Sequence, residues 1–169
     1  YHRKDDKRGA RYELEGTTFQ LPARSPVPAL KAILAGSYEK PERDLSRKWL
    51  PRGLPAIELG GSYGIVSYVL RDHLDNEQPL TILEANPDLI EICRGNVARA
   101  NGGDAEVLHA ALAYGQDSVS FTITDGLHTS HVSTDGSSFE GRKIDVPAMS
   151  LDDILARQNI TGPFSLVCD

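Results

Sequence analysis

The sequence predicts an α/β fold in which helices cover both faces of a mainly parallel sheet. From residue 56 onward, short apolar segments alternate with segments whose apolar residues recur at helical spacing. This order of strand, helix, strand, helix and strand is typical of a parallel sheet with right-handed crossovers. The segments "AIEL" and "FSLVC" are apolar on both faces, which indicates strands that are buried on both sides.

The composition of the chain bounds its class of function. A length of 169 residues, of which 40% are hydrophobic, allows one domain with a substantial core. The net charge of −6 gives no attraction to nucleic acid, so we expect no nucleic-acid partner. No apolar run approaches the ~20 residues that span a bilayer, so we expect no membrane span. Cys93 and Cys168 form no CxxC pair, which indicates a reducing compartment, and we expect a cytoplasmic location.

The chain divides into an N-terminal arm with covering helices, residues 1–50, and an α/β domain, residues 51–169. The N-terminal segments that we expect are a polar, irregular stretch at 1–25 with one extended piece at 18–21, and helices at 29–39 and 41–50. A glycine can end the first of these helices, and a proline begins the second. Tyr38 and Trp49 are expected to pack the two helices over the sheet.

The elements of the α/β domain follow from the pattern in order. The expected strands are 56–59, 80–85, 105–112, 118–124, 142–149 and 163–169, and the expected helices are 62–74, 86–100 and 150–158. Asn86 is a good N-cap for the helix at 86–100, and Pro87 suits its first position. Ser150 and Asp153 have the spacing of a capping box. A polar loop is expected at 125–141.

A glycine-rich turn follows the first strand of the domain and precedes a helix. In open parallel sheets, ligands bind beyond the carboxyl ends of the strands, and glycine lets a ligand approach the main chain closely. A dinucleotide site of the type G-x-G-x-x-G, started at Gly60, needs glycine at two positions that here hold Ser62 and Ile65. The turn also lacks the Gly-Lys-Ser/Thr ending of a nucleotide-binding loop. An alternative is that Gly60 and Gly64 only permit tight packing of strand against helix.

An acidic residue, Glu84, ends the second strand of the domain. An ionised carboxylate there can accept hydrogen bonds from ribose hydroxyls, each contributing about 1.5–3 kcal/mol. This placement suits either of two adenosine cofactors, a nicotinamide dinucleotide or S-adenosylmethionine. Because the glycine pattern departs from the dinucleotide pattern, we expect S-adenosylmethionine. Tyr63 lies inside the glycine turn, where its backbone N–H can contact this cofactor.

Five segments occur in a fixed order: "AIELGGSYGIVSYVL", "ILEANPDLIEICRGNVARAN", "VLHAALAYG", "VPAMSLDDIL" and "FSLVCD". Together they resemble the FkbM-type methyltransferases, a family with the class I, Rossmann-like fold that depends on S-adenosylmethionine. The resemblance covers residues 38–169. The family's first motif reads Asp-x-Gly-Ala-Asn-x-Gly, and this chain departs from it by placing Glu58 for the aspartate and Ser62 for the asparagine.

The resemblance implies which residues hold the cofactor. They are Glu58, Gly60, Gly61, Ser62 and Gly64 in the first motif, Glu84, Ala85 and Asn86 at the ribose, and His109, Ala110 and Ala111 beside the adenine ring. It also aligns Asp169 with the first acid of an Asp-x-Glu-Gly motif, which makes Asp169 the candidate catalytic base or substrate anchor. Because the family's sheet continues beyond this motif, the sheet of this chain is expected to be incomplete on its C-terminal side.

The function that the resemblance implies is methyl transfer to a hydroxyl group of a sugar, a glycolipid or a polyketide-like metabolite. Two alternatives stay open: an NAD(P)-dependent oxidoreductase with an irregular glycine turn, and a degenerate methyltransferase-like domain that serves as a binding module. His128 and His131 lie in the polar loop, and three roles are open for them: solvated side chains, a catalytic base or metal ligands. We expect no metal, since no other ligand set has the spacing to complete a site. The oligomeric state is left open.

Overall fold

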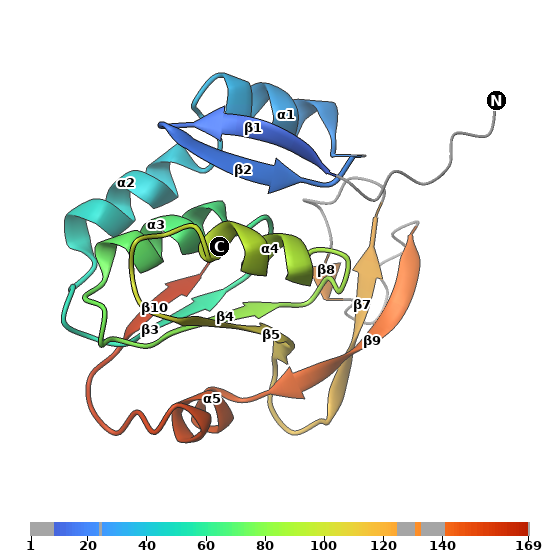
Figure 1. Cartoon of the computed structure of the whole chain (residues 1–169). Helices are drawn as coiled ribbons and strands as arrows, with labels where there is room; N and C mark the ends of the chain where they lie inside the picture. The colour runs from blue at the N-terminus through green and yellow to red at the C-terminus, as the bar shows by residue number, and fades with distance from the viewer. Residues whose placement is uncertain (1–8, 24, 125–130, 133–140, 169) are drawn as a thin grey trace.

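A four-stranded parallel sheet forms the centre of the molecule (Figure 1). The computed structural model describes residues 9–23, 25–124, 131–132 and 141–168. The strands of the central sheet, in spatial order, are β10 (Ser165–Cys168), β3 (Ala56–Leu59), β4 (Leu80–Glu84) and β5 (Ala105–His109), and all three neighbouring pairs are parallel. The predicted parallel sheet is therefore confirmed for this part of the chain.

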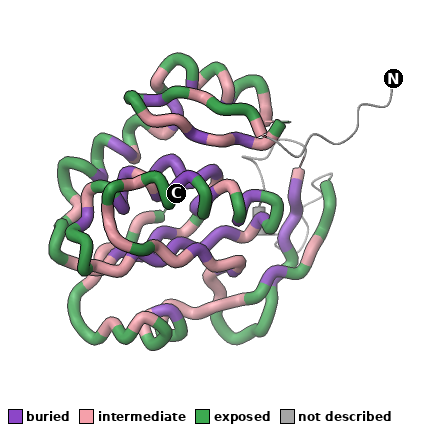
Figure 2. Tube along the Cα trace, viewed as in Figure 1, coloured by how far each residue is buried: buried purple, intermediate pink, exposed green. Residues whose placement is uncertain are grey.

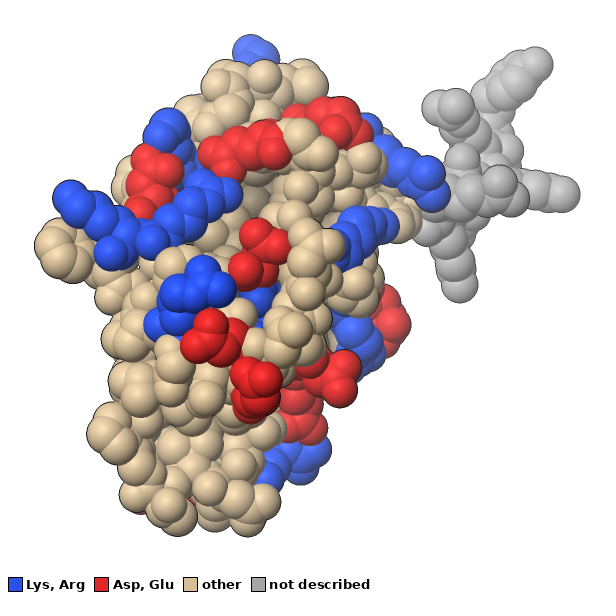
Figure 3. All heavy atoms as spheres, turned by 60° about the vertical axis from the view of Figure 1, so that its left-hand side comes forward, with Lys and Arg blue, Asp and Glu red and all other residues tan. Residues whose placement is uncertain are grey.

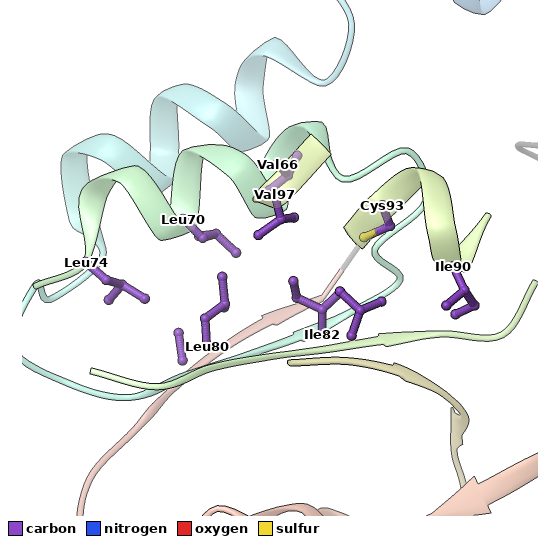
Figure 4. Packing of buried hydrophobic residues seen from close by; sticks show 10 residues of the cluster. Val66, Leu70, Leu74, Leu80, Ile82, Ile90, Cys93 and Val97 are labelled. Atoms are coloured by element: carbon purple, nitrogen blue, oxygen red, sulfur yellow. The ribbon is translucent and has the colours of Figure 1, made fainter. Parts of the chain in front are cut away.

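Helices cover both faces of this sheet, as the sequence predicts. The helices are α3 (Ile65–His73) and α4 (Ile90–Val97) on one face and α5 (Leu151–Arg157) on the other (Figure 1). Figure 4 shows the larger core, where side chains such as Leu70 and Cys93 point from the helices toward Ile82 on β4. On the opposite face, Ile154 of α5 packs with Ile57 and its neighbours. This architecture is compatible with a Rossmann-like fold.

A third layer, built from the N-terminal residues, lies over α3 and α4 (Figure 1). It consists of β1 (Ala10–Leu14), β2 (Thr17–Leu21), α1 (Val27–Leu34) and α2 (Lys40–Trp49). The extended piece expected at 18–21 is confirmed as part of β2, but the irregular structure expected before it is wrong, because β1 pairs with β2 as an antiparallel hairpin. Glu15 and Gly16 at its tip have φ angles of 49° and 80°, the pattern of a type I′ turn, whose twist matches a hairpin. Phe19 is buried beneath it.

A second, mostly antiparallel sheet extends from the end of β5. Its strands, in spatial order, are β6 (Ala111–Leu112), β9 (Arg142–Met149), β7 (Ser118–Ile123) and β8 (His131–Val132). The single strand expected at 105–112 is thus wrong: it divides at Ala110, and its last two residues pair with β9 instead of continuing beside β4. Val119, Phe121 and Val146 supply the buried face of this sheet.

Two of the expected helix starts have different outcomes. The capping box of α5 is confirmed, because the Asp153 N–H donates to Ser150 Oγ at 3.1 Å and the Ser150 N–H donates to Asp153 Oδ2 at 2.8 Å. The expected start of α4 at Asn86 is wrong, because the helix begins at Ile90. Asn86 instead closes a turn, in which its Oδ1 accepts the N–H of Asp88 at 3.0 Å.

The surface differs from expectation at two places. Trp49 is 68% exposed at the end of α2, with Lys48 Nζ 4.9 Å above its ring, so it does not pack this helix on the sheet as expected. The expectation that "FSLVC" is buried on both sides is wrong, because β10 is an edge strand and its Leu166 and Cys168 are exposed. Tyr38 is buried as expected. Figure 2 shows how burial concentrates in the central sheet and the helices against it. Among the described residues, no helix has the length and apolar character to cross a membrane.

Charges of both signs are interspersed on the face drawn in Figure 3. Several of them form ion pairs between elements, such as Arg47 with Glu15 at 2.6 Å and Arg52 with Asp75 at 3.3 Å. Exposed pairs of this kind contribute little to stability, roughly 0–1 kcal/mol each. On this face, the net negative charge therefore forms no single-sign patch that would select a charged macromolecule.

Candidate functional site

The turn between β3 and α3, residues 60–64, brings main chain to the carboxyl end of the central sheet. Its first two N–H groups both donate to the Leu83 carbonyl of β4, at 2.9 and 3.0 Å. Gly60, Ser62 and Gly64 have φ angles of 96°, 45° and 74°, so the turn winds through left-handed conformations. Glycine adopts these without strain, whereas Ser62 adopts one as an L residue.

The glycines of the turn have different structural roles. A Cβ on Gly61 would lie 2.5 Å from Ile82 Cγ2, and one on Gly64 would lie 2.8 Å from the Cys93 carbonyl oxygen. These two glycines let the turn pack against β4 and α4. The packing role that the alternative gave to Gly60 and Gly64 is therefore observed for Gly64, and Gly61 shares it. Gly60, by contrast, is exposed. It is the glycine of this turn that leaves main chain open to a ligand.

Glu84 points from the end of β4 to this turn. Its Oε2 accepts the Ser62 N–H and its Oε1 accepts the Asn86 N–H, both at 2.6 Å. The residue is only 6% exposed, and this burial raises the pKa of its carboxyl above the ordinary value, against the lowering effect of the two N–H donors. Each carboxylate oxygen has a second lone pair, so both can accept another donor.

His109 and the two alanines after it lie at the same edge of the sheet. His109 pairs in register with Glu84, and its Nε2 lies 3.1 Å from the Ala85 carbonyl oxygen. The Ala110 N–H donates to the Glu84 carbonyl at 3.2 Å, while Ala111 begins β6. The structure therefore brings the three predicted segments, residues 58–64, 84–86 and 109–111, to one edge.

Glu58 lies beneath the turn and not on its open side. Its carboxylate is fully buried and accepts a hydrogen bond from the Ser67 hydroxyl of α3. The neighbouring thiol of Cys93 has a raised pKa, first because it is buried and second because of the negative charge of Glu58. Glu58 thus faces the layer of α3 and α4, where it fastens the strand to the helix.

The Tyr63 side chain is also part of the core. It is fully buried against the N-terminal layer, with its ring centroid 5.9 Å from that of Tyr38. Burial raises the pKa of its hydroxyl, and a hydrogen bond with Ser25 opposes this shift. The whole residue is buried and its carbonyl accepts a hydrogen bond from Asn96 Nδ2, so the expected contact of the Tyr63 N–H with a cofactor stays a prediction.

Asn86 carries an unsatisfied donor next to Glu84. The residue is 1% exposed, and within the part of the chain that the structure describes its side-chain Nδ2 has no hydrogen-bond partner. Leaving a buried donor without a partner costs about 1–3 kcal/mol, so such a group is expected to meet an acceptor in the functional state. A ligand at this edge would supply that acceptor.

Several predicted residues do not join this cluster. Asp169 and His128 lie outside the described residues. For His131, the structure describes only that it belongs to strand β8. In the described ranges, no group of three histidine, cysteine, aspartate or glutamate side chains is arranged to hold a metal. The candidate catalytic residue therefore stays a prediction.

Asn96 of α4 is a structural residue that sequence reasoning missed. It is fully buried, exchanges two hydrogen bonds of 2.8 Å with the main chain of Gln20, and donates from Nδ2 to the Tyr63 carbonyl at 2.7 Å. It thereby joins the hairpin, the helix and the glycine turn. A signal existed: Asn96 stands between Cys93 and Val97 on the apolar face of its helix, where a polar residue requires a partner.

A scan against protein-family models found no match to this chain, and a search of curated proteins found none either. The methyltransferase resemblance therefore stays a prediction from the sequence.

Proposed function

We propose that this chain binds S-adenosylmethionine at the carboxyl ends of β3, β4 and β5, and transfers its methyl group to a hydroxyl of a sugar, a glycolipid or a polyketide-like metabolite. The observation that carries the proposal is the Glu84 carboxylate bonded to the Ser62 N–H. This hydrogen bond joins an acidic side chain at the end of β4 to the main chain of the glycine turn after β3.

The strand order supports the same location. The chain runs from β3 outward to β4 and β5, and later returns to the other side of β3 as β10. Such a reversal leaves a crevice at the carboxyl end of the central strand, and open α/β sheets bind their ligands there. The glycine turn follows β3 at this point of reversal.

The residues present fit a nucleoside with a charged sulfur and no phosphate. Glu84 has lone pairs left for ribose hydroxyls, Gly60 has no side chain to fill the crevice, and Asn86 holds an unpaired donor in the described structure. By the resemblance, His109, Ala110 and Ala111 would border the adenine ring. Glu58 would act through the shape of the turn, because its own carboxylate is bonded to Ser67.

The bound sulfonium supplies an activated methyl group. What remains for the protein is to hold the acceptor oxygen in line with that methyl, and correct positioning contributes up to ~7–11 kcal/mol to such reactions. A hydroxyl acceptor also needs a base for its proton. Asp169, which follows β10 directly in the sequence, is the proposed base or anchor. The free thiols of Cys93 and Cys168 favour a reducing compartment such as the cytoplasm.

One observation favours a competing function. Glu84 is almost fully buried, and both of its oxygens already accept main-chain N–H groups. A degenerate domain that keeps the fold without binding a cofactor would have the same arrangement. The nicotinamide alternative has less support, because Ser62 and Ile65 stand where a dinucleotide turn has glycines.

Titration calorimetry with S-adenosylmethionine, S-adenosylhomocysteine and NAD separates these functions. We expect adenosylhomocysteine to bind, and Glu84→Gln to weaken binding by roughly 10–100-fold, the loss of a charged acceptor for ribose. Glu91→Gln, which changes an exposed glutamate on α4, is the matched control and should leave binding unchanged. Binding of NAD alone would identify an oxidoreductase, and no binding of any of the three would identify a degenerate domain.

A further inference from the structure

We propose that Asn101 is a site of spontaneous deamidation, where the chain slowly converts an asparagine to aspartate or isoaspartate, and that the Asp72 carboxylate restrains this reaction. The site lies in the turn between α4 and β5, residues 98–104, at the amino end of the sheet. The candidate functional site lies at the opposite, carboxyl end. The inference is therefore independent of the proposed function.

Asn101 has the neighbour that this reaction requires. It is the one asparagine of the sequence that a glycine follows. The attacking atom is the main-chain nitrogen of the next residue, and glycine has no side chain to hinder its approach. Asn101 is exposed, and in the described part of the chain the Gly102 N–H has no hydrogen-bond partner. The Gly102 nitrogen is therefore free to react.

The fold itself requires a glycine after Asn101. A Cβ on Gly102 would lie 2.3 Å from the Arg71 carbonyl oxygen and 2.6 Å from the Arg71 Nε. Arg71 is held in place, because its guanidinium is buried and donates to the carbonyls of Asp75 at 2.7 Å and Asp104 at 3.1 Å. Any larger residue at position 102 would clash with this fixed main chain. The packing requirement thus leaves an Asn-Gly pair at the surface.

The reaction needs no partner but water. The Gly102 nitrogen loses its proton and forms a bond to Cγ of Asn101, the Cγ–Nδ2 bond breaks, and Nδ2 leaves with the proton as ammonia. Water then opens the cyclic imide at one of its two carbonyl carbons. Opening at Cγ gives aspartate, and opening at the main-chain carbonyl gives isoaspartate, in which the main chain runs through Cγ. Because the deprotonated nitrogen attacks, the rate should rise with pH.

Asp72 of α3 holds the amide that has to move. Its Oδ1 accepts the Asn101 Nδ2–H at 3.3 Å and the Asn101 N–H at 3.5 Å. The first of these bonds restrains rotation of the side-chain amide toward Gly102. The negative charge of the carboxylate also opposes deprotonation of the Gly102 nitrogen. Removal of the Asp72 charge should therefore speed the reaction.

Mass spectrometry of the folded chain tests the proposal. At mildly alkaline pH the natural chain should gain one dalton, located by peptide mapping at Asn101, while Asn76, an exposed asparagine followed by glutamate, stays unchanged. Asp72→Asn should speed this gain roughly 3–10-fold. Asp75→Asn, at an exposed aspartate that pairs with Arg52, is the matched control and should leave the rate unchanged.

The same measurement in concentrated urea excludes an effect through unfolding, because there the natural chain and Asp72→Asn should react at equal rates. No gain at Asn101 in the folded chain, or an equal gain at Asn76, would overturn the site. An unchanged rate in folded Asp72→Asn, or a faster rate that persists in urea, would overturn the restraint by Asp72.

Asn101→Asp reproduces one product without the reaction. Its new carboxylate would face that of Asp72, so urea denaturation should show an equilibrium constant for unfolding that is roughly 2–5-fold larger, and salt should reduce the difference. The double variant Asp72→Asn/Asn101→Asp should recover most of the loss, because only one carboxylate remains. A loss that persists in the double variant would contradict the contact between these two side chains.

Discussion

The two sides of the turn at residues 60–64 differ in what they contact. The inner side packs on β4 and α4, where Gly61 and Gly64 leave no space for a Cβ and Glu58 is enclosed below them. The outer side holds exposed Gly60 and the N–H of Ser62, which faces the Glu84 carboxylate. One short motif therefore combines a packing requirement with the surface that we propose binds the ligand.

A glycine-rich motif is therefore not by itself evidence of ligand binding. Inner-side residues should govern the free energy of unfolding, and outer-side residues should govern affinity. Any inner-side change that spares stability, or any outer-side change that spares affinity, would contradict the division. We expect the largest effects on the inner side and the smallest at Glu84.

Gly64→Ala should destabilise the chain most, by about 3–5 kcal/mol, because it adds a clash to a disfavoured conformation. The new Cβ would lie 2.8 Å from the Cys93 carbonyl oxygen and 2.9 Å from its Cα, at a φ of 74°. Gly16→Ala is the matched control, since Gly16 has a φ of 80° but no atom within 4 Å of its Cβ position. It should cost only about 1 kcal/mol in urea denaturation. Equal losses in the two variants would show that the turn can move away from Cys93.

Asn96→Ala should cost about 2–4 kcal/mol, because it leaves the main-chain groups of Gln20 and Tyr63 without partners in the interior. The loss would be measured by urea denaturation, with Asn76→Ala at an exposed asparagine as the control. A loss no larger than that of the control would mean that the hairpin is attached mainly through its apolar contacts.

Ser67→Ala should cost about 1–2 kcal/mol, because the buried Glu58 carboxyl loses the hydroxyl that donates to it. Thermal unfolding measures the loss, and Ser120→Ala on the exposed side of β7 provides the comparison. On the division above, the affinity for adenosylhomocysteine should stay within about twofold of that of the natural chain. A large loss of affinity with unchanged stability would place Glu58 on the ligand side.

The smallest effect should come from the ionisation of Glu84. Burial raises its pKa above the ordinary 4.5, so the folded chain holds this proton more tightly than the unfolded chain does. The resulting stabilisation is complete below that value and is lost as the pH rises through the folded-state pKa. The stability of the natural chain relative to Glu84→Gln, measured by urea denaturation, should therefore fall as the pH rises from the ordinary value of 4.5 through the raised folded-state pKa. A rise instead would mean that the two N–H donors outweigh burial.

Much of the fold could be predicted because burial imposes a period on apolar residues. The segments "AIEL" and "LTILE" are strands as expected, since a strand between two helical layers is apolar throughout. The hairpin was not predicted, because its alternation is weak and its turn depends on left-handed Glu15 and Gly16. The division at Ala110 was not predicted either, since a strand that passes from one sheet to another keeps the same local pattern.

The order of strands along the chain was enough to predict which residues lie at the sheet edge. It was not enough to predict the direction in which each side chain points. Glu84 reaches the turn because parallel strands end at the same edge. The direction of Glu58 was not predictable, because a four-residue strand buried on both faces does not show which residues face which layer. The contact of Asn96 with Gln20 joins residues far apart in the sequence, so only the folded chain reveals it.

The pairing of Ala56 with Ser165 has a consequence for how the chain reaches this structure. The central strand β3 can pair with β4 soon after both are synthesised. Its other edge pairs with β10, which follows much later in the chain. Non-local parallel pairing of this kind slows folding, and chains fold from their N-terminal side during synthesis. Until β10 arrives, an apolar strand in the middle of the future sheet is an open edge that can pair with another chain. The strand β3, which is interior in the finished sheet, is thus the part most open to pairing with another chain during synthesis.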